Sequence, residues 1–113
     1  MRIGPLYHWS PRDRKKQIIR HGLRPSQRVT TNSGEEGYRA AHVCLSPSPA
    51  VAWSLSGGTG WTGIEQWDLW QVELGQMDMV DVQQSWGGNI TEVRVRNRIP
   101  KSRLWWVGER ITA

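Results

Sequence analysis

Apolar and polar residues alternate with a period of two along the second half of the chain, which is typical of half-buried β-strands. The segment QWDLWQVEL, residues 66–74, predicts a strand with a break in its alternation around Trp70. Its inward positions are expected to be Trp67, Leu69, Val72 and Leu74. MVDVQQ at 79–84, ITEVRVR at 90–96 and RLWWVGE at 103–109 predict three further strands. In the middle one, Val93 and Val95 share one face, and Glu92, Arg94 and Arg96 share the other.

The first half mixes short apolar runs with helix-start signals. A strand over residues 3–9 is followed by Ser10 as a helix N-cap and Pro11 at the first helical position. That helix is expected to run to about His21, with Ile18, Ile19 and Leu23 turned inward and Gly22 as its C-cap. HVCLS at 42–46 predicts a short strand, and Ser46 then caps a second helix over 47–56. Residues 24–41 and the Gly-rich stretch at 57–63 are expected to be loops.

Two early helices and a run of later strands predict a single compact α+β domain over residues 1–113, built on antiparallel β-sheets; the split-sandwich arrangement of these sheets is implied only by the family resemblance given below. Eight Trp residues supply more apolar area than so small a core needs, so some are expected to line a site that stacks on a ring. The single Cys44 excludes an internal disulfide, and its spacing to histidine does not indicate a metal site. With neither a signal segment nor an apolar run of about 18 residues, we expect a cytoplasmic, monomeric protein away from membranes.

Charge is unevenly distributed along the chain. Residues 1–28 carry eight basic side chains and one acidic one, residues 29–92 one and eight, and residues 93–113 six and one, so the segment charges of +7, −7 and +5 give the net +5. If the basic ends meet in space, they form a positive face that attracts nucleic acid, nucleotide phosphates or an acidic protein. A plain solvated surface is the alternative.

Three strand-like segments each carry a polar residue of defined chemistry at one end. These segments are LYHWS with His8, HVCLSPS with Ser46, and ITEVRVRNRIPKSRLWWVG with Glu92. In this order, and with the Gly22–Leu23 pair after the first helix, the chain resembles the ADP-ribosyltransferase superfamily, in its small diphtheria-toxin-like branch with a His-Tyr-Glu triad. The resemblance spans nearly the whole chain and implies an ADP-ribosyltransferase-like fold that uses NAD as a substrate and needs no metal.

The resemblance also implies roles for individual residues. Glu92 would hydrogen-bond the 2′-hydroxyl of the nicotinamide ribose and stabilise the positive charge that develops as nicotinamide leaves. His8 would orient the dinucleotide through a ribose hydroxyl. Further cofactor-binding residues are Tyr7, Ser10 and Ser46, and the missing middle tyrosine of the family would be replaced by Trp53 or, second, by Trp61. The loop QQSWGGN, with Trp86 and Gly87, and the basic pair Arg94 and Arg96 would bind the target.

Other interpretations of the same residues remain open. His8 can be a buried structural histidine, Glu92 a solvent-facing acid paired with Arg94 or Arg96, and Ser46 only a helix cap. At the level of function, the leading hypothesis is a mono-ADP-ribosyltransferase that modifies a protein or nucleic acid, of the toxin, phage-effector or anti-defence type. The alternatives are a non-catalytic, basic, Trp-rich module that binds nucleic acid or protein, and an NAD hydrolase of the same fold.

Overall fold

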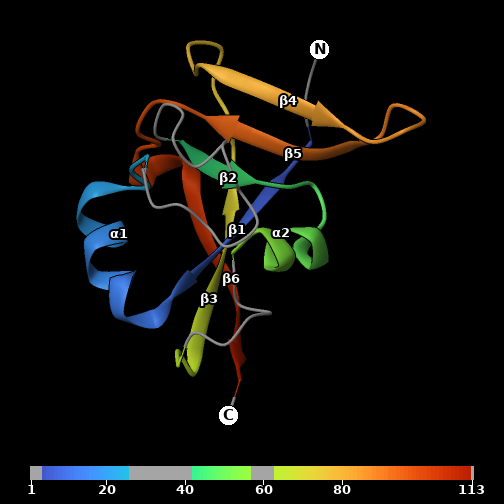
Figure 1. The fold of residues 1–113 in the computed structure, drawn as a ribbon. Helices are drawn as coiled ribbons and strands as arrows, with labels where there is room; N and C mark the ends of the chain where they lie inside the picture. The colour runs from blue at the N-terminus through green and yellow to red at the C-terminus, as the bar shows by residue number, and fades with distance from the viewer. Residues whose placement is uncertain (1–3, 26–41, 57–62, 113) are drawn as a thin grey trace.

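A computed structural model describes residues 4–25, 42–56 and 63–112 (Figure 1). Its strands and helices follow one another as β1 (Leu6–Pro11), the 3₁₀ turn η1 (Arg12–Arg14), α1 (Lys15–His21), β2 (Val43–Leu45), α2 (Pro49–Ser56), β3 (Gln66–Val72), β4 (Val80–Gln84), β5 (Ile90–Val95), the 3₁₀ turn η3 (Lys101–Arg103) and β6 (Leu104–Ile111). The predicted α+β class is confirmed: the described residues form two helices and two small antiparallel sheets. No helix among them is long and apolar enough to cross a bilayer.

The strands form two three-stranded sheets, with the orders β1-β3-β6 and β2-β5-β4. In Figure 1, β2, β5 and β4 run across the upper part of the view, and β1, β3 and β6 run steeply below them. The sheets meet where Tyr7 and Ser46 pair through their backbones, with N–O distances of 2.8 and 3.1 Å. Across this bridge β5, β2 and β1 are successive neighbours. The three segments singled out in the sequence therefore lie side by side.

The core lies between the inner faces of the two sheets and is closed by α1. Its buried residues are Leu6, Ile18, Leu23, Val43, Leu45, Trp70, Val72, Val93, Val95, Ile99 and Leu104. Val93 and Val95 are fully buried, as the alternation in 90–96 predicts. Gly22 ends α1 with φ 76°, and a Cβ there would lie 2.0 Å from the Ile99 carbonyl oxygen, so only glycine fits.

The predicted helix starts are wrong in both places. Ser10 and Pro11 still belong to β1, because they pair with Asp68 and Trp67 of β3, and α1 begins only at Lys15 after η1. Ser46 does not cap α2 either. Ser48 takes that position: its side-chain oxygen accepts a hydrogen bond from the Val51 amide at 3.3 Å, and its carbonyl accepts one from Ala52.

Strand β3 keeps the predicted break but not all of the predicted inward residues. Its pairing with β6 shifts between Leu69 and Trp70, where the alternation was expected to fail. Trp67, Trp70 and Val72 are buried, whereas Leu69 is half-buried and the acid Asp68 is completely buried. On α1, Ile19 points outward with 41% of its surface exposed.

Candidate active site

Cys44 of β2 lies between the two residues that the sequence puts forward for catalysis. The His8 ring on β1 is hydrogen-bonded through Nδ1 to the Cys44 carbonyl oxygen at 2.9 Å. On the other side of Cys44, β5 pairs with β2 so that Cys44 lies opposite Arg94, two residues after Glu92. The Cys44 sulfur, one imidazole nitrogen of His42 and one carboxylate oxygen of Glu92 all lie within 4.8 Å of one another. His8 and Glu92 therefore both lie next to Cys44, His8 at its carbonyl and Glu92 at its sulfur.

The protonation state of His8 follows from its hydrogen bond. A carbonyl oxygen only accepts, so Nδ1 must carry the hydrogen. Burial lowers the pKa of His8 below its usual value, the positive charge of Arg14 lowers it further, and the bond to Cys44 partly opposes both effects. His8 is therefore neutral at neutral pH, with Nε2 as a hydrogen-bond acceptor.

Glu92 is a buried carboxylate on the polar face of β5. Only 8% of its surface is exposed, and the Arg94 Nε donates a hydrogen bond to its Oε1 at 3.0 Å. The ion pair with Arg94 agrees with the structural alternative for this residue, but the burial does not, because a solvent-facing strand acid would be exposed. Arg96 pairs instead with Asp81 of β4, at 3.5 Å and largely in solvent.

His42 and Cys44 lie beside Glu92, although the sequence analysis did not single out His42 and found no metal-site spacing for Cys44. The alternation of HVCLS was available as a signal: Val43 and Leu45 are buried, so the residues flanking them share the opposite face. What the local pattern could not supply was the register that places β2 against β5, with Cys44 opposite Arg94.

The predicted cofactor-binding residues on β1 and β2 are placed mainly by their backbones. Tyr7 and Ser46 form the bridge between the sheets. Ser46 is fully buried, and its Oγ accepts a hydrogen bond from the Ser48 amide at 3.2 Å. Ser10 is also buried, beside Asp68 rather than beside Glu92. Ser46 therefore lies next to Tyr7 and His8, whereas Ser10 belongs to a different part of the sheet.

Trp53 does not offer an open ring for stacking. It packs edge-on against Trp9 and Trp67, with ring centroids 5.3 and 5.1 Å apart, and the Arg110 guanidinium lies over it at 4.3 Å. Only 7% of its surface is exposed. A nicotinamide ring would have to displace Arg110, so the expectation for Trp53 is corrected to that of a core aromatic. Trp61, the second choice, lies outside the described residues.

Asp68 is a second buried acid that the sequence did not single out. Its Oδ1 accepts hydrogen bonds from Arg12 Nε at 2.7 Å and from Trp106 Nε1 at 2.9 Å. Within the described part of the chain, its Oδ2 and the Trp70 Nε1 are buried polar atoms without a partner. The alternation predicts Asp68 on the outward face, so only the packing of β3 reveals that it is buried, with Arg12 as its counter-ion.

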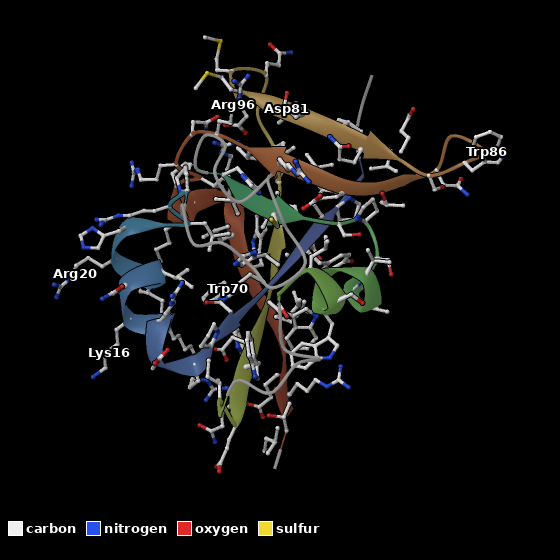
Figure 2. The ribbon with its side chains drawn as sticks, viewed as in Figure 1. Lys16, Arg20, Trp70, Asp81, Trp86 and Arg96 are labelled. Carbon is white, nitrogen blue, oxygen red and sulfur yellow. The ribbon has the colours of Figure 1, made fainter. Side chains whose placement is uncertain are left out.

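The predicted target-reading loop is the turn between β4 and β5. Trp86 lies at its tip with its side chain fully exposed (Figure 2). Gly87 and Gly88 have φ values of 105° and 87°, and the Ser85 amide donates to the Asn89 carbonyl at 2.8 Å to close the turn. The hairpin thus presents one indole to solvent from a defined backbone, as expected for an aromatic that contacts a partner.

Within residues 4–25, 42–56 and 63–112, the basic side chains do not form one unbroken positive face. Arg12 is paired with Asp68 and Glu109, and Arg94 and Arg96 are paired with acids of sheet β2-β5-β4. Lys16 and Arg20 project from α1 on the side of the molecule away from Trp86 (Figure 2). Arg98 joins the two basic segments by donating to the His21 carbonyl at 2.8 Å, as Arg12 does through its ion pair with Glu109.

Comparison of the chain with protein-family models, with curated proteins and with solved structures finds no significant match. The interpretation of the site therefore depends on the residues themselves.

Proposed function

We propose that the protein is an NAD-dependent mono-ADP-ribosyltransferase that modifies a macromolecule. The observation that carries the proposal is that His8 and Glu92, on two strands that flank β2, each lie beside Cys44, His8 at its carbonyl and Glu92 within 4.8 Å of its sulfur. A neutral histidine whose Nε2 can accept a hydrogen bond could orient the ribose, and a buried carboxylate could stabilise the positive charge that develops as NAD is cleaved.

The reaction breaks the bond between C1′ of the nicotinamide ribose and the pyridinium nitrogen. Nicotinamide leaves with the bonding electron pair, and the sugar passes through an oxocarbenium-like state that an acceptor nucleophile captures at C1′ with loss of its proton. Glu92 would accept a hydrogen bond from the ribose 2′-hydroxyl and stabilise the developing positive charge, which raises the rate more than the affinity. Arg94 holds the carboxylate in place through Oε1.

His8 would act in binding rather than in bond breaking. Its Nδ1 is committed to Cys44, so Nε2 is available to accept a hydrogen bond from a ribose hydroxyl. Because burial keeps the ring neutral, this role does not change across the neutral pH range. Trp61 remains the candidate for stacking on nicotinamide, because the ring of Trp53 is covered.

Exposed indoles favour a second candidate function, a binding module without chemistry. Trp86 is fully exposed, and Trp105 and Trp106 on the edge strand β6 expose 45% and 46% of their surfaces. Such rings suit stacking on bases or docking on an apolar surface. Of the two indoles on β6, Trp106 is the weaker candidate for contacting a partner, because its indole N–H donates to Asp68 and Lys15 lies over its ring.

The two functions separate in one experiment. The protein is incubated with NAD labelled in its adenylate half and with a cell extract, and covalent label is sought in the protein and nucleic-acid fractions. The proposal expects label in one fraction, its loss in Glu92→Gln, and its retention in Glu109→Gln, a control in which an exposed acid is changed. If no fraction carries covalent label, and wild type and Glu92→Gln both retain a partner from the extract, the binding module is favoured. Release of free ADP-ribose without a labelled acceptor would favour a hydrolase.

A further inference from the structure

His42, Cys44 and Glu92 together present the donor atoms of a metal site. Their ligand atoms, one imidazole nitrogen, one sulfur and one carboxylate oxygen, lie within 4.8 Å of one another. Ligands bound to one Zn²⁺ at about 2.0–2.3 Å lie about 3–4 Å apart, so small side-chain rotations would close the cluster. Cys44 lies in β2, and His42 immediately precedes that strand. Glu92 lies in β5, which pairs with β2.

We propose that these three residues bind Zn²⁺ as a site with three protein ligands. Nitrogen, thiolate sulfur and carboxylate oxygen are all zinc donors, and three protein ligands leave a fourth position for water. A thiolate and a carboxylate supply two negative charges, which balance the charge of the ion. The alternation of HVCLS places His42 and Cys44 on one face, but the local pattern does not reveal the third ligand, because Glu92 is distant from them in the chain.

Arg94 is the feature of the surroundings that opposes a cation. Its guanidinium is bonded to Glu92 Oε1 at 3.0 Å, and its side chain is largely buried. A carboxylate that binds a metal is commonly hydrogen-bonded by a neighbouring group, and Arg94 can supply that bond to one oxygen while the other binds the ion. Arg94 would then hold Glu92 in place as a ligand, while its positive charge limits the affinity of the site for a cation.

A metal at this site would occupy the carboxylate that the proposed transferase reaction needs. If the proposed function is correct, Zn²⁺ inhibits NAD cleavage by binding Glu92, and a chelator restores it. The metal binding itself does not depend on NAD chemistry, so it is measured without NAD and the two proposals fail separately.

Co²⁺ is the probe for the direct test, because it replaces Zn²⁺ and is visible. The full chain, kept reduced with a phosphine, is titrated with Co²⁺ while the thiolate-to-metal charge-transfer band and the visible bands of four-coordinate Co²⁺ are recorded. Zn²⁺ is then added to displace Co²⁺. The variants are Cys44→Ser, His42→Gln and Glu92→Gln, and His21→Gln on α1 is the matched control histidine. Thermal melting verifies that each variant is folded.

The expected result is one Co²⁺ per chain with a charge-transfer band that Zn²⁺ abolishes. The band should be absent in Cys44→Ser, and affinity should fall at least about tenfold in His42→Gln and Glu92→Gln but stay unchanged in His21→Gln. A titration without the thiolate band, or equal affinity in wild type and Glu92→Gln, would overturn the site. Inhibition of label transfer by Zn²⁺ in the absence of Co²⁺ binding at these residues would also count against it.

Discussion

Cys44 serves different partners with its backbone and its side chain. Its carbonyl fixes the His8 ring, and its sulfur lies beside Glu92 and His42. A residue with no catalytic role in the proposed reaction thus positions His8, while Arg94 holds Glu92. This arrangement explains why a histidine stands where β1 meets the second sheet: beyond the Tyr7–Ser46 bridge the ring reaches across to β2.

Replacing His8 by Ala should weaken NAD binding. The variant loses one hydrogen bond to a ribose hydroxyl, which corresponds to about a tenfold rise in Kd, and its rate should fall as well. Quenching of Trp fluorescence by NAD gives the affinity, and His21→Ala is the control. Unchanged affinity in His8→Ala would assign the ring to a purely structural role.

Asp68→Asn should destabilise the fold. Asp68 is completely buried and carries the charge that balances Arg12, so neutralising it should cost about 2–4 kcal/mol of unfolding free energy. Urea unfolding measures this loss. Glu109→Gln removes the other partner of Arg12, at an exposed position, and should cost less than about 1 kcal/mol. Equal effects of the two variants would contradict the assignment of Asp68 as the buried counter-ion.

At the scale of elements, the sequence predicts the strands better than the ends of the helices. The alternation in 90–96 places Val93 and Val95 inward, and the break at Trp70 coincides with an irregularity in pairing. Ser10 and Pro11 carry a helix-start signal, yet pairing with β3 holds them in a strand, so a long-range contact overrides the local preference.

The residues of the candidate site also differ in how well the sequence predicts them. His8, Ser46 and Glu92 are selected because their segments resemble the motifs of a known superfamily, and the topology does bring these segments together. The expectation that each lies at the end of a strand is wrong for His8 and Glu92, which lie within β1 and β5. His42 and Cys44 could not be selected from the sequence, because their importance depends on the register between β2 and β5. Stacking of nicotinamide on Trp53 is predicted from its position in the sequence alone, and only the packing reveals that Arg110, Trp9 and Trp67 cover its ring.

Asp78 ties the turn between β3 and β4 to the segment that leads into β6. It accepts hydrogen bonds from the Gly75 amide at 2.8 Å, from Asn97 at 2.7 Å and from both terminal nitrogens of Arg103. The hydrogen bond from Arg103 is the main cause that lowers the pKa of Asp78 to about 2, and the bonds from Gly75 and Asn97 lower it further. Burial acts in the opposite direction and raises the pKa.

Low pH should therefore remove the stabilisation that the hydrogen bonds of Asp78 to Gly75, Asn97 and Arg103 give the fold; we call these bonds the Asp78 clamp. The folded-state pKa lies below that of an unfolded Asp, about 3.9, so the stabilisation is complete above that pH and is lost as pH falls towards 2. Urea unfolding at several pH values should show a shallower decline over this window in Asp78→Asn than in wild type. Asp81→Asn, whose acid is half-exposed and pairs loosely with Arg96, should decline as wild type does. Parallel curves for Asp78→Asn and wild type would contradict the clamp.

At the scale of the whole molecule, the exposed Trp86 and the basic helix α1 lie at opposite ends (Figure 2). A small ligand cannot contact both, whereas a nucleic acid or a large protein can. Because Arg12, Arg94 and Arg96 are already paired with acids, α1 provides more of the available positive charge than the rim of the site does.

Transfer to a nucleic-acid target should then depend on salt and on Trp86. Raising salt from about 50 to 200 mM should reduce transfer at least about tenfold, because phosphate contacts release counterions. Trp86→Ala should reduce transfer more than NAD hydrolysis, and the fold should be unaffected because the ring is fully exposed. Transfer that is indifferent to salt would point to an apolar protein surface as the target.

The most direct test of the central claim is the initial rate of nicotinamide release at saturating NAD by wild type and Glu92→Gln, measured with the acceptor-containing extract present. If Glu92 stabilises the positive charge on the ribose, the rate should fall about 10²–10³-fold while the Kd for NAD changes only slightly. Equal rates in the two proteins would contradict the assignment of Glu92 as the catalytic carboxylate.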